Sequence, residues 1–527
     1  MIREGDFLHR ILERLQQMEP AQWRDVTILL PGRRAGRKLT EALKQPQYAG
    51  HWLPHITTLG EWSADQLGLH VPGKVELLVE LQQVAEGLRK EYRLPDWGSF
   101  DRFQPWGKAA LADFNTLDHH LLDVRQAFRD LRNIKDIEAW SFNRPDLTAG
   151  QRAFLEQWNA LYPLHTAFHE HLRNFGSTTP GMLARLMATE EDAIRHAGGT
   201  VWMAGANALT PAEHKIVDRL IRAGRGEWMW DTDRSYVSHG QEAGRFVRQI
   251  VSRERWSSLP HPLADAAQQG RHPVREWNVV TCSSRTMQTQ YVREQLEREG
   301  DHVPDRTAII LPSSDLAPQL LSAIPGSIGK VNLTMGVSLD RTPLRSFLHL
   351  LFGLHSDKGR LHHSRLRGLL AHPITRLMHP KAAGQLDALT RHCAKYSAIR
   401  MTREDLAPFP EIERLLTPWW QGCATAEAAR DDGTTTLLSA VARWTDAPGT
   451  RLPKDPWLAA TWMGFRDIVA LHERSIDRTG PPPDLQETRA RIQQWTSLHA
   501  VDLAGEPLEG LQVMGLLESR GLDFDEV

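Results

Sequence analysis

The sequence predicts a mixed α/β protein in which short parallel strands are interrupted by long helical segments, in an arrangement that occurs twice. Short apolar runs that end at glycine or proline, such as residues 26–30, are typical of buried parallel strands. Helical periodicity dominates residues 63–195 and 351–505. Strand signals return after each helical segment, at Thr200 and at Leu511. We therefore expect two α/β cores, each interrupted by a helical insertion.

The first core begins with an apolar helical pattern over residues 7–15 and a strand at 26–30. Pro31-Gly32 ends that strand, and a second helix follows from about Ala35. In the insertion, Thr148 and Gln151 form a capping box, which predicts the start of a long helix.

The strand pattern resumes at residues 200–203 and again at 227–230. Between these strands, Thr210, Pro211 and Glu213 supply the N-cap, the first-turn proline and the capping-box acid of a helix. The first core therefore consists of two separate stretches of chain that meet in one sheet.

The second core follows a Pro-, Ser- and Gln-rich stretch that we interpret as a linker. The predicted elements of this core are strands at 278–282 and 307–311, helices at 288–299, 315–324 and 344–354, and a last strand from Leu511. The resulting units are a first core at 1–62 plus 196–255, an insertion at 63–195, a linker at 256–276, a second core at 277–350 plus 506–527, and an insertion at 351–505. The second core is expected to be truncated, because a further strand begins at Val527.

Composition limits the classes of function. The 527 residues are too many for one core, and the net charge of −2 gives no global basic field, so any nucleic-acid binding must use local patches. Three distant cysteines argue against a disulfide framework and fit a reducing compartment. With no signal peptide and no apolar run of about 18 residues in the sequence, we expect a cytoplasmic protein without a membrane partner.

The turn after the first strand carries four cations, Arg33, Arg34, Arg37 and Lys38. It lies at a strand-to-helix junction, where backbone amides and the helix dipole favour anions. The turn does not match GxxxxGK[ST], the pattern of a nucleotide-binding phosphate loop, because three residues separate the glycines and a leucine follows Lys38. Three interpretations of these cations remain open: they contact nucleic-acid phosphates, they form a solvated basic helix start, or they bind a nucleotide, which is the weakest of the three.

Other chemical motifs are weaker. Asp231 follows a short strand but is more typical of a turn than of a magnesium ligand. His165 and His169 share one helix face, as a metal pair does, yet the sequence supplies no third ligand. His362-His363 has the same weakness, and no Ser/His/Asp set is readable. We therefore predict no metal ligands and no catalytic residues.

The terminal stretch LQVMGLLESRGLDFDEV resembles a motif of superfamily-one helicases of the UvrD/RecB type, a strand followed by T-x-H-x-x-K-G-L-E-F. Gly521, Leu522 and Phe524 match this motif. Arg520 replaces its lysine, and Asp523 replaces its glutamate. The threonine and histidine of the motif are also replaced here. In active motors this segment couples nucleotide to DNA, so the departures agree with the missing phosphate loop.

The chain as a whole resembles the AddB-like, PD-(D/E)XK nuclease family proteins of Bacteroidetes-type bacteria, which are relatives of the inactivated-helicase subunits AddB and RecC. Four segments carry the resemblance in the order of the family: ILLPGRRAG at 28–36, FDRFQPWGKAALADF at the start of 100–140, GANALTPAE at 205–213 and VNLTMGVSLDRTPL at 331–344.

The resemblance implies two RecA-like domains, each with a helical insertion, and a nuclease region beyond residue 527. It implies a DNA-binding, helicase-like portion of a subunit that repairs double-strand breaks, on single strands or duplex ends, with a possible AddA-like motor partner. Mg²⁺ is expected only for the nuclease region, and ATP binding is not expected. By this resemblance Arg33, Arg34, Arg37, Lys38 and Arg520 contact phosphates. The alternatives are an active ATP-dependent helicase and a protein-interaction scaffold without catalysis.

Overall fold

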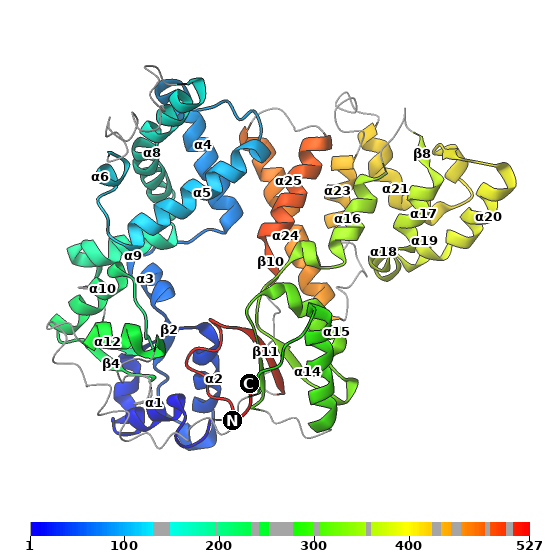
Figure 1. Ribbon diagram of the computed structural model, residues 1–527. Coiled ribbons are helices and arrows are strands. Elements are labelled where there is room, and N and C mark those ends of the chain that lie inside the picture. The colour runs from blue at the N-terminus through cyan, green and yellow to red at the C-terminus, as the bar shows by residue number, and fades with distance from the viewer. Residues whose placement is uncertain are drawn as a thin grey trace.

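The structure of the chain is a computed structural model. The structure describes residues 2–129, 148–194, 198–232, 242–251, 278–299, 306–354, 360–423, 434–443, 455–479, 485–501 and 510–527. The predicted linker at 256–276 lies outside these residues. The fold is mixed α/β, and its two parallel sheets lie at one end of the molecule below two groups of helices (Figure 1).

The first sheet has four strands that are all parallel, in the order β2-β1-β3-β4. These strands are β1 (Val26–Leu30), β2 (His55–Thr58), β3 (Thr200–Ala204) and β4 (Gly226–Met229). The predicted strands at 26–30, 200–203 and 227–230 are confirmed to within one residue. β2 was not predicted, because this edge strand has one apolar residue, Ile56, among polar neighbours.

Helices cover both faces of this sheet. On one face, α1 (Phe7–Gln16) and α2 (Arg33–Leu43) pack against Ile28 and Trp202. On the other face, Leu29 and Met203 contact helices that lie partly in the predicted insertion. These helices are α3 (Leu59–Leu67), α9 (Pro180–Thr189), α10 (Pro211–Arg222) and α12 (Arg245–Val251). The capping box predicted for α10 is present, with Thr210 and Glu213 satisfying each other's backbone amides.

The second sheet has three parallel strands, with the last strand of the chain in the middle. β11 (Leu511–Gly515) lies between β5 (Ala308–Leu311) and β6 (Val331–Leu333). The helices of this part of the chain are α14 (Arg285–Glu299) and α15 (Ala317–Ala323). The predicted strand at 278–282 is wrong. Those residues form neither helix nor strand, and Val279 is 90% exposed, so its side chain does not pack in a hydrophobic core.

The two helical segments pack on each other, although the sequence suggested separate insertions. One apolar core runs through both of them, and Phe100 meets Trp495 edge-on at 5.6 Å between ring centroids. The first segment holds α4 (Lys74–Tyr92), α5 (Phe100–His119), α6 (Val124–Arg129) and α8 (Ala149–Asn174). The capping box predicted from Thr148 and Gln151 is present at the start of α8.

The second helical segment begins at α16 and ends at β10, which pairs with β7 in an antiparallel bridge to the second core. Its elements are α16 (Leu344–Phe352), β8 (Leu361–His362), α17 (His363–Ala371), α18 (Pro373–Met378), α19 (Pro380–Gly384), α20 (Leu386–Tyr396), β9 (Arg400–Met401), α21 (Pro410–Cys423), α23 (Thr434–Ala442), α24 (Pro456–Thr479), α25 (Leu485–Leu498) and β10 (Ala500–Val501), with β7 at Val337–Ser338. Among the described residues, no helix has the length and apolarity needed to span a bilayer.

Candidate nucleic-acid interface at the junction of the two sheets

The basic turn lies where the sequence predicts it, between the buried strand β1 and helix α2. Gly32 is the N-cap of α2 and provides no capping side chain. Gly36 lets the helix approach β2, because a Cβ at this position would lie 3.1 Å from the Cγ2 atom of Ile56. The strand order changes direction between β1 and β3, so the first turn of α2 adjoins the crevice where open parallel sheets bind ligands.

The four cations of the turn divide into two pairs at helical i, i+4 spacing. Arg33 and Arg37 share an exposed face of α2, and the Arg33 side chain pairs with Glu61 while remaining 71% exposed. Arg34 and Lys38 share the next face of the helix, about 100° around its axis, and this face is turned toward the second sheet. Arg34 is buried and donates from Nη2 to Oε1 of Gln512 on β11. Only the first pair is placed to meet a large external ligand.

Lys38 lies against the terminal segment of the chain. Its Nζ is 5.7 Å from the centroid of the Phe524 ring, a cation–π contact. Burial lowers the pKa of Lys38, and the nearby positive charge of Arg306 lowers it further. The Lys38 ammonium therefore belongs to the junction between the two sheets.

The segment Gly521–Phe524 covers the start of α2 and α1. Gly521 has a left-handed φ of 69°, and a Cβ there would lie 3.5 Å from Cβ of Ala35 and 3.7 Å from Cγ of Pro31. The carboxylate of Asp523 accepts a hydrogen bond from the backbone amide of Phe7 at 2.8 Å. Asp523 therefore caps the N-terminus of α1 from 516 residues away in the sequence. The positive end of the α1 helix dipole stabilises the negative charge of this carboxylate.

Phe7 fills the crevice at the ends of the strands. Its side chain is 0% exposed and lies against Gly205, the residue that follows β3. Gly205 has φ 74°, and a Cβ there would be 2.9 Å from the Phe7 ring. The Phe7 ring also lies 3.8 Å from the position of a Cβ on Gly521. The chain's own side chains thus occupy the space beside the first turn of α2.

A buried ion pair holds the same junction. Arg306, which precedes β5, donates to both carboxylate oxygens of Asp6, at 2.6 and 2.9 Å. The Arg306 side chain is 6% exposed and the Asp6 side chain 11%. Arg306 also contacts Asp525 at 3.1 Å, and Asp525 contacts Arg3 at 2.7 Å. Figure 1 shows the two chain ends side by side at this point.

The electrostatics of this pair favour the charged forms. Burial raises the pKa of Asp6, but hydrogen bonds from the Arg306 side chain and the Arg3 amide, with the charge of Arg306, hold it below the usual value. The hydrogen bonds to Asp6 raise the pKa of Arg306 in spite of its burial. Each side chain therefore stabilises the charge of the other, which makes the pair a specific contact between the two cores.

Arg520 is exposed and directly precedes Gly521, which places it near the first turn of α2. Arg33, Arg37 and Arg520 are thus the predicted cations that lie on the surface here, and Arg34 and Lys38 are the ones drawn inward. The spacing of the two pairs was visible in the sequence, but the inward direction of one pair depends on Gln512 and Phe524, which are far away along the chain.

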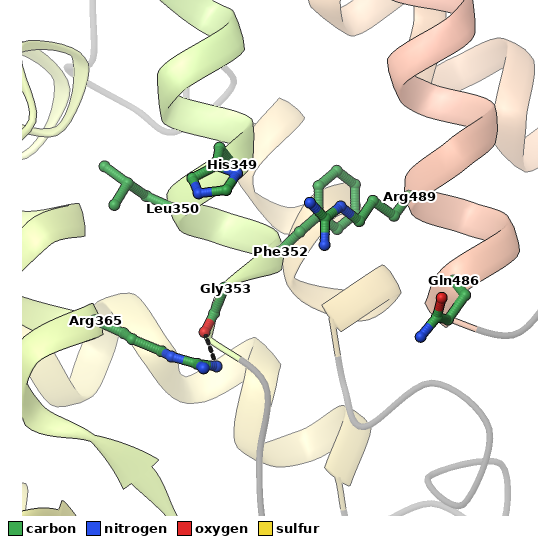
Figure 2. A pocket seen from close by; sticks show the side chains of 7 residues that line it. All are labelled: His349, Leu350, Phe352, Gly353, Arg365, Gln486 and Arg489. Atoms are coloured by element: carbon green, nitrogen blue, oxygen red, sulfur yellow. Dashed lines mark hydrogen bonds between the residues drawn. The ribbon is translucent and has the colours of Figure 1, made fainter.

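A second basic feature, which the sequence did not indicate, lies between α16, α17 and α25 (Figure 2). It is a cavity of about 390 Å³ lined by His349, Leu350, Phe352, Gly353, Arg365, Gln486 and Arg489. None of these lining residues is acidic, and Arg365 donates to the Gly353 carbonyl at 2.7 Å. Because its residues come from three helices, no local motif identifies it.

Comparison with known proteins adds no family assignment. No protein-family model matches this chain, and no curated protein matches it significantly.

Proposed function

We propose that this chain is the DNA-binding, helicase-like portion of an AddB-like helicase–nuclease subunit that acts in double-strand break repair or recombination. In this proposal the two parallel sheets are RecA-like cores that no longer hydrolyse ATP. The protein works in the cytoplasm on single strands or duplex ends, beside an AddA-like motor subunit. Strand cleavage and its Mg²⁺ are assigned to a nuclease region outside residues 1–527.

The observation that carries the proposal is the junction itself. In a nucleotide-driven motor, the crevice beside the helix after the first strand holds phosphates, and the terminal motif responds to them. Here Phe7, Gly521 and the Asp6–Arg306 pair occupy that region. A contact between the cores that is made by side chains needs no nucleotide, and this supports a static scaffold over a motor.

The exposed cations support DNA as the ligand. Arg33, Arg37 and Arg520 lie on the surface around one helix start, where phosphate contacts position a nucleic acid without reading its sequence. The Arg33–Glu61 pair does not prevent this role, because exposed ion pairs contribute at most about 1 kcal/mol. A phosphate can therefore replace Glu61 at small cost.

Fluorescence anisotropy with labelled single-stranded and forked DNA tests the proposal. We expect binding without ATP at low salt and a steep loss of affinity as salt rises. Replacing Arg33, Arg37 and Arg520 by alanine in one triple variant should weaken binding to both DNAs. A control triple substitution, at Arg222, Arg403 and Arg414, removes exposed arginines that form ion pairs elsewhere and should leave binding unchanged.

Two results would overturn the proposal. Equal losses from the two triple variants would show that the helix start has no special role. DNA-stimulated ATP hydrolysis that disappears in Lys38→Ala would show an active motor instead.

A further inference from the structure

Two histidines and one aspartate from different helices converge in the first helical segment. Asp118 lies in the last turn of α5, and His165 and His169 lie one turn apart on α8. One ligand atom from each residue lies within 4.8 Å of the others. We propose that Asp118, His165 and His169 bind a single zinc-like divalent metal ion.

The distances suit such an ion. Nε2 of His165 is 3.3 Å from Oδ1 of Asp118, and Nε2 of His169 is 3.0 Å from Oδ2. Zinc bonds to histidine nitrogen and carboxylate oxygen are about 2.0–2.1 Å, which puts tetrahedral ligand atoms roughly 3.3 Å apart. The three side chains are thus close to ligand spacing: His169 already faces Oδ2, whereas His165 faces Oδ1 and must shift toward the ion.

Two buried polar atoms lack hydrogen bonds at this place. The Oδ2 atom of Asp118 and the Nε2 atom of His169 face each other at 3.0 Å, yet neither makes a hydrogen bond of acceptable geometry. The Asp118 side chain is 0% exposed, so water does not compensate for its second oxygen. Because unsatisfied buried polar atoms are costly, a ligand between them stabilises the structure.

Arg185 fixes the carboxylate from its other side. Its Nε donates to Oδ1 of Asp118 at 2.7 Å, and its Nη2 donates to the carbonyls of Leu117 and Leu122 at 2.9 and 2.7 Å. Hydrogen bonds of this kind orient metal-binding carboxylates. They leave Oδ2 for the ion. The positive charge of Arg185 opposes the cation, so we expect weaker binding than at a site without it.

The donor set indicates the class of metal. Two imidazole nitrogens and one carboxylate oxygen suit zinc or a neighbouring transition metal, whereas magnesium and calcium prefer oxygen ligands alone. The His169 side chain is 15% exposed while its Nε2 atom is buried, so the proposed ion lies just beneath the surface. Spacing on α8 supplied only two ligands, and the prediction of no metal ligands rested on the lack of a third. Asp118 supplies it from another helix.

The test measures zinc retained by the stripped and zinc-reloaded protein after gel filtration, by elemental analysis. We expect one zinc per chain in the wild type, and a loss of affinity of at least about tenfold in His169→Gln, since even indirect disturbance of a ligand has that effect. The control His171→Gln alters a histidine on the same helix that pairs with Glu80 at 2.7 Å, and it should retain zinc.

Two outcomes refute the proposal. If the wild type retains no zinc, or if His169→Gln retains as much as the wild type, the histidines serve only as neighbours of Asp118. If His169→Gln does not fold, the site is tested in the wild-type protein by loading it with cobalt in place of zinc. A visible cobalt spectrum that stoichiometric zinc abolishes supports the site, and the absence of any such spectrum refutes it.

Discussion

The Asp6–Arg306 pair provides a quantitative test of how the two cores are joined. We consider Asp6→Asn and Arg306→Met, which remove one charge each while preserving side-chain volume. Loss of one partner from a buried ion pair costs roughly 3–5 kcal/mol. After Asp6→Asn, Arg306 keeps its contact with Asp525, whose side chain is 38% exposed, and after Arg306→Met, Asp6 keeps the hydrogen bond from the Arg3 amide. We therefore expect a value at the low end, about 3 kcal/mol, for each single variant.

The two substitutions should not be additive. Once either charge is lost, removing the other also removes an uncompensated buried charge, so the double variant should be more stable than the sum of the two effects predicts. We expect a coupling energy of about 2 kcal/mol. The exposed pair Arg293–Glu297 has a similar separation, 2.7 Å, but both side chains are nearly half exposed, so its coupling should be below about 0.5 kcal/mol.

Hydrogen exchange is the suitable assay, measured in the peptides that cover α1 and residues 511–527 for the Asp6–Arg306 pair and in those that cover α14 for the Arg293–Glu297 pair. A chain of this size need not unfold in one step, and exchange reports the free energy of opening for a defined segment. The reasoning is refuted if the effects of Asp6→Asn and Arg306→Met on opening add within about 0.5 kcal/mol. It is also refuted if Arg293–Glu297 couples as strongly.

Three further predictions concern the same junction. Because the folded-state pKa of Asp6 lies below its ordinary value of 3.8, its contribution is complete above that pH and is lost as the pH falls further, so Asp6→Asn should flatten the acid part of a stability–pH curve. Asp523→Ala removes the cap of α1 and should destabilise that helix by about 1 kcal/mol in hydrogen exchange, whereas Asp523→Asn, which retains an acceptor oxygen, should cost less. Gly205→Ala meets both a positive φ and the Phe7 ring and should lower the melting temperature clearly, whereas Gly224→Ala has a positive φ but open space and should cost only about 1 kcal/mol.

Local sequence signals predicted five of the seven strands in the two parallel sheets, and long-range contacts explain where they failed. The strand at 26–30 and the capping boxes at Thr148 and Thr210 are encoded within a few residues, so the sequence was sufficient. The strand predicted around Val279 was wrong, because an apolar run becomes a strand only when a neighbouring strand completes its hydrogen bonds.

The candidate sites depend still more on distant residues. Arg34 resembles its neighbour Arg33 in the sequence, but Arg34 lies on the buried face of α2, where Gln512 of β11 accepts its hydrogen bond. Asp118 lies on α5 and His169 on α8, and no local motif indicates that these two helices bring the side chains together. The basic turn was therefore predictable as a location, whereas the roles of its individual side chains were not.

The most direct test of the central claim is the slope of log binding constant against log salt concentration for single-stranded DNA, compared between the wild type and the Arg33/Arg37/Arg520 triple alanine variant. Each phosphate contact on a single strand contributes about 0.7 to this slope, so losing three contacts should reduce its magnitude by about 2. An unchanged slope, or a wild type that does not bind DNA at low salt, would contradict the account.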